Sequence, residues 1–367
     1  MILSSILTQN FRNLEASRQQ FHPSVNLLVG RNGHGKTNLL EAIYFLATSK
    51  SFRTTRPASL LTFGSTTLFL SGEVERNGLT RTLSIGLEQG DARRRVVQIN
   101  EERVPLARYV TELTVLAYSA SRLEIVRGVP EERRRFLDRG IASNYQTYLE
   151  DLTAYARALK QRNALLQAVG SGGSPAALLD PWDEELARRG ASVQRARLTY
   201  VAELSRVFRE IVERHDYHVR DVEFVYKPSG NGPDELLNVL RRHRRDEIRA
   251  RMSLFGPQRD TLDFVIDGRL VAEVLSGGEQ KMMVLFLKFA KLELFRARFD
   301  EAPVFVLDDI DAELDLQILE NLLSRLPVET QVFATSAKEE FLAALEAGPH
   351  RRLTLENGAV TTVRDFS

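Results

Sequence analysis

The fold class is decided by the stretch Gly30-Arg31-Asn32-Gly33-His34-Gly35-Lys36-Thr37. It fits the pattern G-x-x-x-x-G-K-[ST] and lies between an apolar segment at 25–29, which predicts a strand, and a segment at 36–47 with apolar residues at helical spacing. Glycines in such a loop let backbone N–H groups turn inward around a phosphate, and the helix that follows adds the positive end of its dipole. The stretch therefore predicts a P-loop that binds a nucleoside triphosphate.

Two side chains of this loop carry most of the expected chemistry. Lys36 is expected to reach the β- and γ-phosphates and to act in catalysis, and the hydroxyl of Thr37 is expected to bind Mg²⁺. The other six residues of the loop are expected to contact the nucleotide as parts of the same cradle. The alternative is a glycine loop that only turns a strand into a helix, but the full pattern in this setting favours the nucleotide site.

Two adjacent carboxylates follow a second apolar strand. Residues 303–307 are apolar, and Asp308 and Asp309 come directly after them, as a P-loop protein requires on a strand near the loop. Asp308 is expected to hold Mg²⁺ through water. Asp309 is the expected catalytic group that orients or deprotonates the attacking water. On its own the pair could be a solvated turn, so this interpretation depends on the other motifs.

A third motif, Leu275-Ser276-Gly277-Gly278-Glu279-Gln280, precedes a segment rich in apolar residues. Ser276 is a good helix N-cap, and the two glycines leave the helix start open to an anion. Before a strand that ends in paired aspartates, the motif resembles the signature of the ABC ATPase superfamily. There the signature of one copy covers the γ-phosphate held by the P-loop of another. The resemblance implies ATP contacts at Ser276, Gly277 and Gly278, and a dimer joined by ATP.

Two short stretches extend this resemblance. Residues 311–315 resemble the D-loop, which crosses the dimer interface in that superfamily. Residues 331–336 resemble the last core strand before the switch position, where this chain has Thr335 or Ser336.

The periodicity of apolar residues divides the chain into two lobes. Asn77-Gly78 predicts a tight hairpin in an antiparallel sheet inserted near the N-terminus. From 121 to 252 the period becomes helical, and the flexible run at 170–175 separates two helical segments. We expect an α/β P-loop ABC-type ATPase head with this inserted antiparallel β-subdomain at 1–120 and 253–367. Residues 121–252 are expected to form a second, mainly helical lobe, a short antiparallel helical hairpin with four or five turns in each arm.

The composition of the chain excludes several classes. The 367 residues are 43% hydrophobic and 27% charged, which is typical of a folded globular protein, and a net charge of +1 does not itself indicate nucleic acid. The chain has no cysteine, which excludes disulfides and thiolate chemistry and suits a reducing cytoplasm. No apolar run approaches the roughly 18 to 20 residues that span a bilayer, so no membrane partner is expected. The opening residues 1–7 predict a strand and not an export signal.

Several stretches of the sequence indicate which branch of the ABC superfamily the chain resembles. The segment between Thr37 and Leu275 is much longer than the helical subdomain of a transporter ATPase. Asn32 and the opening Asn10-Phe11-Arg12-Asn13 resemble the branch of the structural-maintenance-of-chromosomes, Rad50 and RecF proteins. A Rad50 protein would need a very long coiled coil and a Cys-x-x-Cys hook, and this chain has neither. What remains is a resemblance to the bacterial RecF family over nearly the whole chain. It is carried by residues 10–14, the P-loop, 51–53, 130–138, 256–260, the signature with Lys281, and 307–315.

This resemblance implies a cytoplasmic, ATP-dependent DNA-binding protein of recombinational repair. It implies a slow, DNA-dependent ATPase that forms a homodimer with Mg-ATP, and it adds Arg12 to the expected nucleotide contacts. The implied partners are double-stranded and gapped DNA, together with RecR and RecO, which assist the loading of RecA. Two alternatives stay open. One is the ATPase subunit of an ABC transporter, which the inserted helical lobe opposes, and the other is a chromosome-organising head.

The chain departs from the usual RecF pattern at residues 120–122, at Gln258 and at Gly278-Glu279. Its arginines gather at 93–95, 133–135 and 241–251. Arginine suits phosphate and carboxylate equally well, so these runs are either DNA contacts or structural ion pairs. With no motif for base readout, any DNA binding is expected to be backbone-directed and steeply sensitive to salt.

Overall fold

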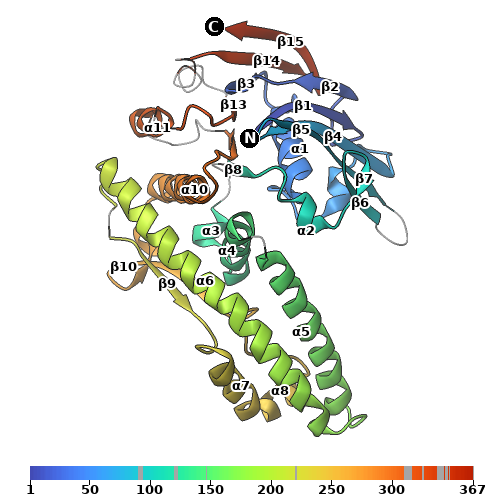
Figure 1. The fold of residues 1–367 in the computed structure, drawn as a ribbon. Coiled ribbons are helices and arrows are strands. Elements are labelled where there is room, and N and C mark those ends of the chain that lie inside the picture. Colours follow the sequence, from blue (N-terminus) through green and yellow to red (C-terminus); the bar gives the residue numbers. More distant parts are fainter. Residues whose placement is uncertain are drawn as a thin grey trace. The chain divides into compact units, whose positions relative to one another are not determined.

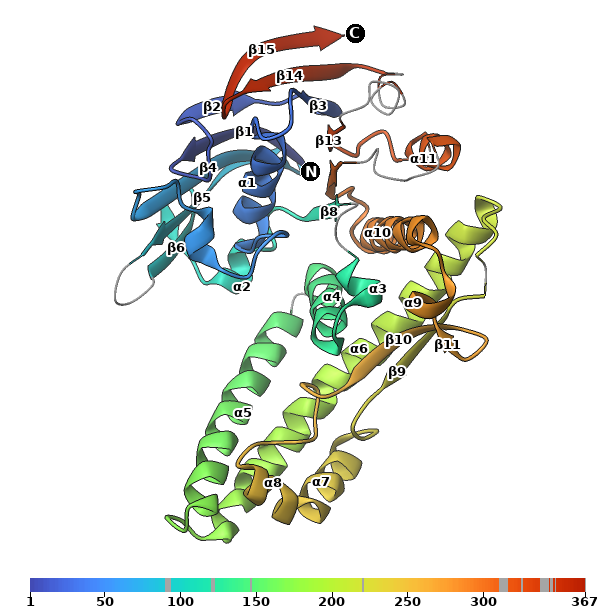
Figure 2. The same cartoon turned by 180° about the vertical axis from the view of Figure 1, so that it is seen from behind.

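The computed structural model describes residues 1–89, 94–119, 123–145, 147–219, 221–309, 316–324, 326–336, 343, 346 and 348–366. The chain forms two compact units, one of Met1–Arg122 with Lys281–Ser367 and one of Leu123–Gln280. Figures 1 and 2 show the elements of both units from opposite sides. Among the described residues, no helix is both long and apolar enough to cross a bilayer.

The first unit contains a six-stranded sheet in the order β15-β14-β3-β13-β12-β8. All of its strands run parallel except β15, which returns antiparallel to β14. Its middle strands are short apolar runs, as buried parallel strands must be. Since β13 lies between β3 and β12, the loop after β3 and the residues after β12 reach the same edge of the sheet. The bounds are β3 Val25–Val29, β8 Val115–Ser119, β12 Val304–Asp308, β13 Val332–Thr335, β14 His350–Glu356 and β15 Ala359–Phe366.

A second, antiparallel sheet of this unit has the order β2-β1-β4-β5-β6-β7. This is the antiparallel insertion that the sequence predicts, and its β4–β5 turn is Asn77-Gly78 with φ of 51° and 73°, the left-handed pair that a tight hairpin requires. The bounds are β1 Ile2–Gln9, β2 Ser17–Gln20, β4 Thr67–Arg76, β5 Leu79–Glu88, β6 Arg94–Ile99 and β7 Glu102–Arg103.

One apolar core joins both sheets to helix α1 (Lys36–Thr48). Leu40 and Ile43 of α1 lie in it with Leu70 of the antiparallel sheet and Val306 of the parallel one. Because α1 starts directly after the P-loop, this core fixes the helix whose N-terminus faces the expected phosphate. The remaining elements of the unit are η1 Pro57–Leu60, α2 Leu106–Tyr109, α11 Leu316–Leu323 and most of α10 Gly277–Phe299.

The second unit is built around two long helices that pack side by side (Figures 1 and 2). They are α5 (Tyr148–Gly170) and α6 (Asp180–Arg214), and the hairpin agrees with the predicted helical lobe. α6 is 35 residues long, which is longer than the four or five turns expected. Its first half buries small and polar residues such as Gly190 and Gln194. A prediction from regularly spaced apolar residues misses this half because its buried face is not apolar throughout. Shorter helices complete the unit: α3 Glu124–Arg127, α4 Pro130–Asn144, η2 Ala176–Leu179, α7 Pro233–Arg242, α8 Arg244–Ala250 and α9 Val271–Val274.

The second boundary between the units differs from the one expected at 252/253, because residues 253–280 belong to the helical unit. Strand pairing is the reason. β10 (Thr261–Ile266) pairs with β9 (Glu223–Lys227) on one side and with β11 (Arg269–Leu270) on the other. Asp260, just before β10, is buried and accepts hydrogen bonds from Gln194 and Tyr226 of the same unit.

A buried ionic cluster connects the helices near the α5–α6 turn of the hairpin. Arg162 of α5 bonds Asp183 of α6 at 2.8 Å and Glu247 of α8 at 2.6 Å, and all three side chains are fully buried. Arg162 also donates to Ser253 at 2.7 Å. Three helices therefore meet at one guanidinium group.

Replacing Arg162 should destabilise the helical unit strongly, because Asp183 and Glu247 would remain buried without this cation. We expect Arg162→Met to lower the free energy of unfolding by about 3–5 kcal/mol. The matched control is Arg188→Met on α6, whose exposed bond to Glu185 should contribute less than about 0.5 kcal/mol. Urea unfolding followed by circular dichroism measures both, and equal small effects would contradict the assignment.

Candidate functional site

The P-loop turns between β3 and α1 through three glycines with positive φ. Gly30, Gly33 and Gly35 have φ of 139°, 83° and 105°, in the region that favours glycine. Gly35 is the N-cap of α1 and offers no side-chain hydrogen bond, and the first turn of α1 has no acidic residue. The N–H groups at this helix start are therefore left for an anion, which fits a phosphate.

The C-terminal hairpin holds the loop in place. The N–H of Gly358, in the β14–β15 turn, donates to the carbonyl of His34 at 3.0 Å, and its carbonyl accepts from Glu15 N–H at 2.9 Å. A Cβ atom on Gly35 would lie only 3.2 Å from Leu14 Cδ2. The loop is thus packed between two distant parts of the sequence, and glycine is required there for space as well as for φ.

Lys36 lies inside the loop it terminates. Its Nζ donates to the carbonyls of Gly30 at 2.6 Å and Arg31 at 3.1 Å, and the side chain is buried. Arg31 and Asn32 are exposed at the crest of the loop. The ammonium group is therefore held against the backbone of the loop by two carbonyls.

Asp308 joins the P-loop helix to the end of β12. Its Oδ1 accepts a hydrogen bond from Thr37 Oγ1 at 2.8 Å and another from Thr335 Oγ1 at 3.1 Å. Burial, with the charge of Asp309 adding to it, raises the pKa of Asp308 to about 6. A hydroxyl and a carboxylate oxygen beside one another are ligands that Mg²⁺ prefers. A buried carboxylate with a raised pKa also favours a nearby cation, so the residues fit the metal expected at Thr37 and Asp308.

Asp309 is exposed and follows the buried strand with φ of 51°. Its N–H donates to Thr335 Oγ1 at 2.9 Å, so this one hydroxyl contacts both members of the aspartate pair. Thr335 stands at the end of β13, the strand between the P-loop strand and the aspartate strand. Thr335, one of the two residues considered for the switch position, therefore lies in contact with the aspartate pair.

Arg12 is held by an acidic residue that the sequence analysis did not single out. Glu41, fully buried in α1, accepts from Arg12 Nε at 2.8 Å and Nη2 at 3.0 Å, and also from the Ser51 hydroxyl. The Arg12 guanidinium group is therefore paired with Glu41, which lies one helical turn beyond Thr37 in α1.

A chain of amide side chains connects the P-loop to Arg53. Asn13 Nδ2 donates to the carbonyl of Gly33 at 3.2 Å, and Asn38 Nδ2 donates to Asn13 Oδ1 at 2.6 Å. Arg53 Nη1 donates to Asn38 Oδ1 at 2.7 Å, and its charge acts to lower the pKa of Asp308. Asn13 and Arg53 belong to stretches that carry the family resemblance, and this was the only signal for them in the sequence.

The signature serine belongs to the helical unit and forms a capping box at the start of α10. Ser276 is exposed, its Oγ accepts from Glu279 N–H at 3.3 Å, and Glu279 Oε2 accepts from Ser276 N–H at 2.7 Å. Gly277 and Gly278 form the first turn of α10 inside this box. His218 Nε2 lies 2.7 Å from Glu279 Oε1. The hydrogen bonds from Ser276, followed by that from His218, lower the pKa of Glu279 to about 2.

Two of the three arginine runs, 133–135 and 241–251, lie in the helical unit and make polar contacts within it. Arg133 contacts Asp263 at 3.3 Å, Arg134 donates to the carbonyl of Asp260 at 2.9 Å, and Arg135 pairs with Glu131 and Glu132. In the run at 241–251, Arg241, Arg244 and Arg249 pair with carboxylates: Glu184 for the first, Asp180 and Asp183 for the second, and Asp246 for the third. These contacts favour the structural interpretation of both runs. Arg93 and the D-loop at 311–315 lie outside the described residues.

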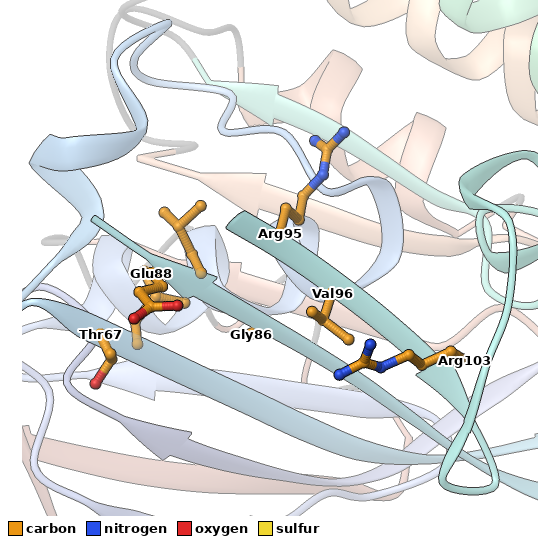
Figure 3. Close-up of a pocket in the computed structure, with 8 residues that line it drawn as sticks. Thr67, Gly86, Glu88, Arg95, Val96 and Arg103 are labelled. Atoms are coloured by element: carbon orange, nitrogen blue, oxygen red, sulfur yellow. The ribbon is translucent and has the colours of Figure 1, made fainter. Parts of the chain in front are cut away.

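A pocket of about 620 Å³ lies on the antiparallel sheet and includes Arg95 and Arg103 (Figure 3). The two side chains point in different directions. Arg95 lies opposite Leu87 and donates to Ser49 at the end of α1, whereas Arg103 lies opposite Gln98. Residues 95 and 98 fall on opposite faces of a strand, so the pocket does not direct both cations at one anion.

The fold and the site together define a class of protein. A mostly parallel sheet with a P-loop after one strand and paired aspartates two strands away, an inserted antiparallel sheet and a helical unit that ends in the signature form an ABC-type ATPase head. The family model for the RecF/RecN/SMC N-terminal domain matches residues 2–358.

Full-length relatives narrow the class to one family. The chain is 33% identical over 369 residues to the DNA replication and repair protein RecF of Geotalea daltonii, covering 98% of this chain and all of the relative. It is 36% identical to RecF of Symbiobacterium thermophilum, with 98% of each chain covered. A solved structure of the recombination mediator protein RecF with ATP, in the RecFOR pathway, superposes with a TM-score of 0.89 at 25% identity, covering 100% of this chain and 98% of that chain. The chain belongs to the RecF family of ATP-binding, ABC-type ATPases.

The capping box predicts a pH-dependent stability. Because the pKa of Glu279 is lowered to about 2 from about 4.5, its stabilisation is present above pH 4.5 and is lost as the pH falls toward 2. We expect Glu279→Gln to cost about 1 kcal/mol at pH 7, and the difference from wild type to shrink between pH 4.5 and 3. Thermal unfolding across this range measures it. Glu273→Gln, at an exposed position shortly before the box, is the control and should show no such trend; a difference for Glu279→Gln that is independent of pH would contradict the charged cap.

Proposed function

We propose that this protein is an ATP-dependent DNA-binding protein of recombinational repair that dimerises around two ATP molecules. In this proposal it binds double-stranded and gapped DNA, at the gap or at a junction between single and double strands. Together with RecR and RecO it then assists the loading of RecA. The observation that carries the ATP part is the hydrogen bond from Thr37 to Asp308, which unites the P-loop with the aspartate strand. Support for the repair part comes from the names of its relatives.

The residues of the first unit would bind the nucleotide and position the water. Lys36 and the N–H groups of the P-loop would hold the phosphates, and Thr37 with Asp308 would hold Mg²⁺, which when bound neutralises phosphate charge. Asp309, exposed beside the buried Asp308, would orient the attacking water and accept its proton. Membership of the RecF family adds to this proposal that the ATPase depends on DNA, turns over slowly and acts as a switch.

The second copy would complete the site with its signature. Ser276 is exposed at the open start of α10, where its hydroxyl also interacts with Glu279 of the capping box. To bind a phosphate oxygen, this hydroxyl would turn its proton away from the Glu279 carboxylate. To move a population from 1:99 to 99:1 in favour of the closed dimer, ATP must favour that state by about 5.5 kcal/mol. Two shared nucleotides offer two sets of such contacts.

A bulky cation at the signature should separate ATP binding from dimerisation. We expect Ser276→Arg to bind ATP as wild type does but to stay monomeric with ATP, and to lose ATP-dependent binding to a labelled gapped duplex. Light scattering and fluorescence anisotropy across a salt series measure both properties. Ser171→Arg, which adds the same charge at an exposed turn of the same unit, should behave as wild type. ATP-driven dimers of Ser276→Arg would refute the shared site, and wild type that binds no DNA with any nucleotide would refute the repair function.

Removing the carboxylate of Asp309 should slow hydrolysis without weakening nucleotide binding. We expect Asp309→Asn to lower ATP turnover about 100-fold or more and to leave an ATP dimer that persists after dilution. Asp300→Asn is a matched control, because Asp300 is also exposed and has φ of 53° against 51° for Asp309. Phosphate release and the lifetime of the dimer are the measurements; unchanged turnover in Asp309→Asn would remove this residue from the mechanism.

A further inference from the structure

One aromatic side chain of the first unit is fully exposed. Phe63 lies in the turn Thr62-Phe63-Gly64-Ser65, which the N–H of Ser65 closes by donating to the carbonyl of Thr62 at 3.0 Å. Gly64, at the third position, has φ of 83°. These are the features of a type II turn, in which the second residue projects outward. The turn therefore displays the Phe63 ring to solvent.

The turn is attached to the sheet on both sides. Thr62 N–H donates to the carbonyl of Asn10 at 3.0 Å, and Leu61 forms a bridge with Phe11. On the other side, Gln89 N–H donates to the carbonyl of Thr66 at 2.8 Å. The exposure of Phe63 thus follows from a backbone that hydrogen bonds hold on both sides of the turn.

The segment that carries Phe63 has an unusual charge pattern. Between Glu41 and Glu73 the chain has no aspartate or glutamate, but it has three cations, Lys50, Arg53 and Arg56. Glu41 itself is fully buried beneath Arg12. In the β4–β5 strand pair, an acidic residue, Glu88, lies opposite Thr67, just beyond the turn that carries Phe63. The segment therefore offers exposed cations at Arg53, which shares Glu41 with Arg12, and at Arg56, together with exposed hydroxyl groups at 55, 59, 66 and 67.

Arg56 adds an exposed cation to the segment that carries the exposed ring. It is the N-cap of η1, and Phe63 follows the other end of this short helix. Within the described part of the chain, Arg53 shares Glu41 with Arg12, whereas no carboxylate pairs with the Arg56 side chain. An exposed ring and an exposed cation on one short segment can contact one extended polyanion.

We infer that this surface, residues 50–66 with Phe63 at its tip, binds a nucleic-acid strand and that Phe63 stacks on an unpaired base. Aromatic side chains that hold single strands stack on bases, while neighbouring arginines and hydroxyl groups contact the phosphates. An intact duplex offers a side chain in this position no free base face. The inference rests on the proposed function and deepens it, because it assigns the recognition of a single-stranded end or junction to a specific surface.

Other occupants of this surface would give different results. A protein partner or a second copy of this chain would also cover an exposed phenylalanine. The exposed Arg56 and the absence of acidic residues from 42–72 favour a polyanion over both, and the experiment below separates the three cases.

The test compares wild type with Phe63→Ala and Phe63→Trp in the presence of ATP. Two labelled DNAs are titrated, a blunt duplex and the same duplex with a short single-stranded overhang. We expect wild type to prefer the overhang, Phe63→Ala to bind it about 5- to 100-fold more weakly with little change for the blunt duplex, and Phe63→Trp to restore the preference. The control is Leu79→Ala, which removes an exposed apolar side chain from the hairpin of the same sheet and should match wild type.

Dimerisation with ATP is measured on the same variants. Equal binding of the overhang by wild type and Phe63→Ala, or equal losses on both DNAs, would overturn the inference and leave the proposed function intact. Loss of the ATP dimer in Phe63→Ala would assign the ring to a second copy of the chain, which also overturns it. If wild type binds neither DNA, the proposed function fails and this inference fails with it.

Discussion

The nucleotide site of this protein depends on one buried carboxylate. Asp308 accepts hydrogen bonds from Thr37, at the start of the P-loop helix, and from Thr335, on the strand between. These two hydrogen bonds connect the ends of β12 and β13 with the helix that follows β3, at one edge of the parallel sheet. Burial makes this charge costly, which is why its pKa is raised to about 6. The cost is reduced by the two hydroxyl groups and would be reduced further by a bound cation, so the same interaction that organises the sheet edge prepares it for Mg²⁺ and phosphate.

The helical unit is organised on a similar principle, with arginine as the central group. Arg197 of α6 bonds Asp138 of α4 at 2.9 Å and the carbonyl of Pro257 at 2.6 Å. Two stretches that carry the family resemblance, 130–138 and 256–260, thus meet at one side chain. In the sequence the arginines at 133–135 could be DNA contacts or structural ion pairs, and in the fold these two stretches connect α4, α6 and the start of β10. Ordered in this way, the unit presents the signature serine at a defined helix start.

Much of the site could be predicted because its motifs are contiguous. The P-loop, the aspartate pair and the signature each lie within a few residues, and each depends on a local property: glycines with positive φ, a strand that ends in acids, a serine that caps a helix. Glu41 could not be predicted as the partner of Arg12, nor His218 as the partner of Glu279, because each pair joins residues far apart in the chain. Nothing in the order of residues indicates which carboxylate a given arginine will meet.

The sequence by itself determined the class of the protein, the inserted antiparallel sheet, the helical lobe and the contiguous motifs of the site, since these follow from short-range spacing and turn chemistry. Only the tertiary structure decided that 253–280 belong to the helical unit, because β10 pairs with β9. It also shows that arginines of the runs at 133–135 and 241–251 pair with carboxylates. It shows as well that Phe63, in the sequence one apolar residue among several, is exposed. Ion pairing and burial are properties of neighbours in space, and the chain brings those neighbours together only when it folds.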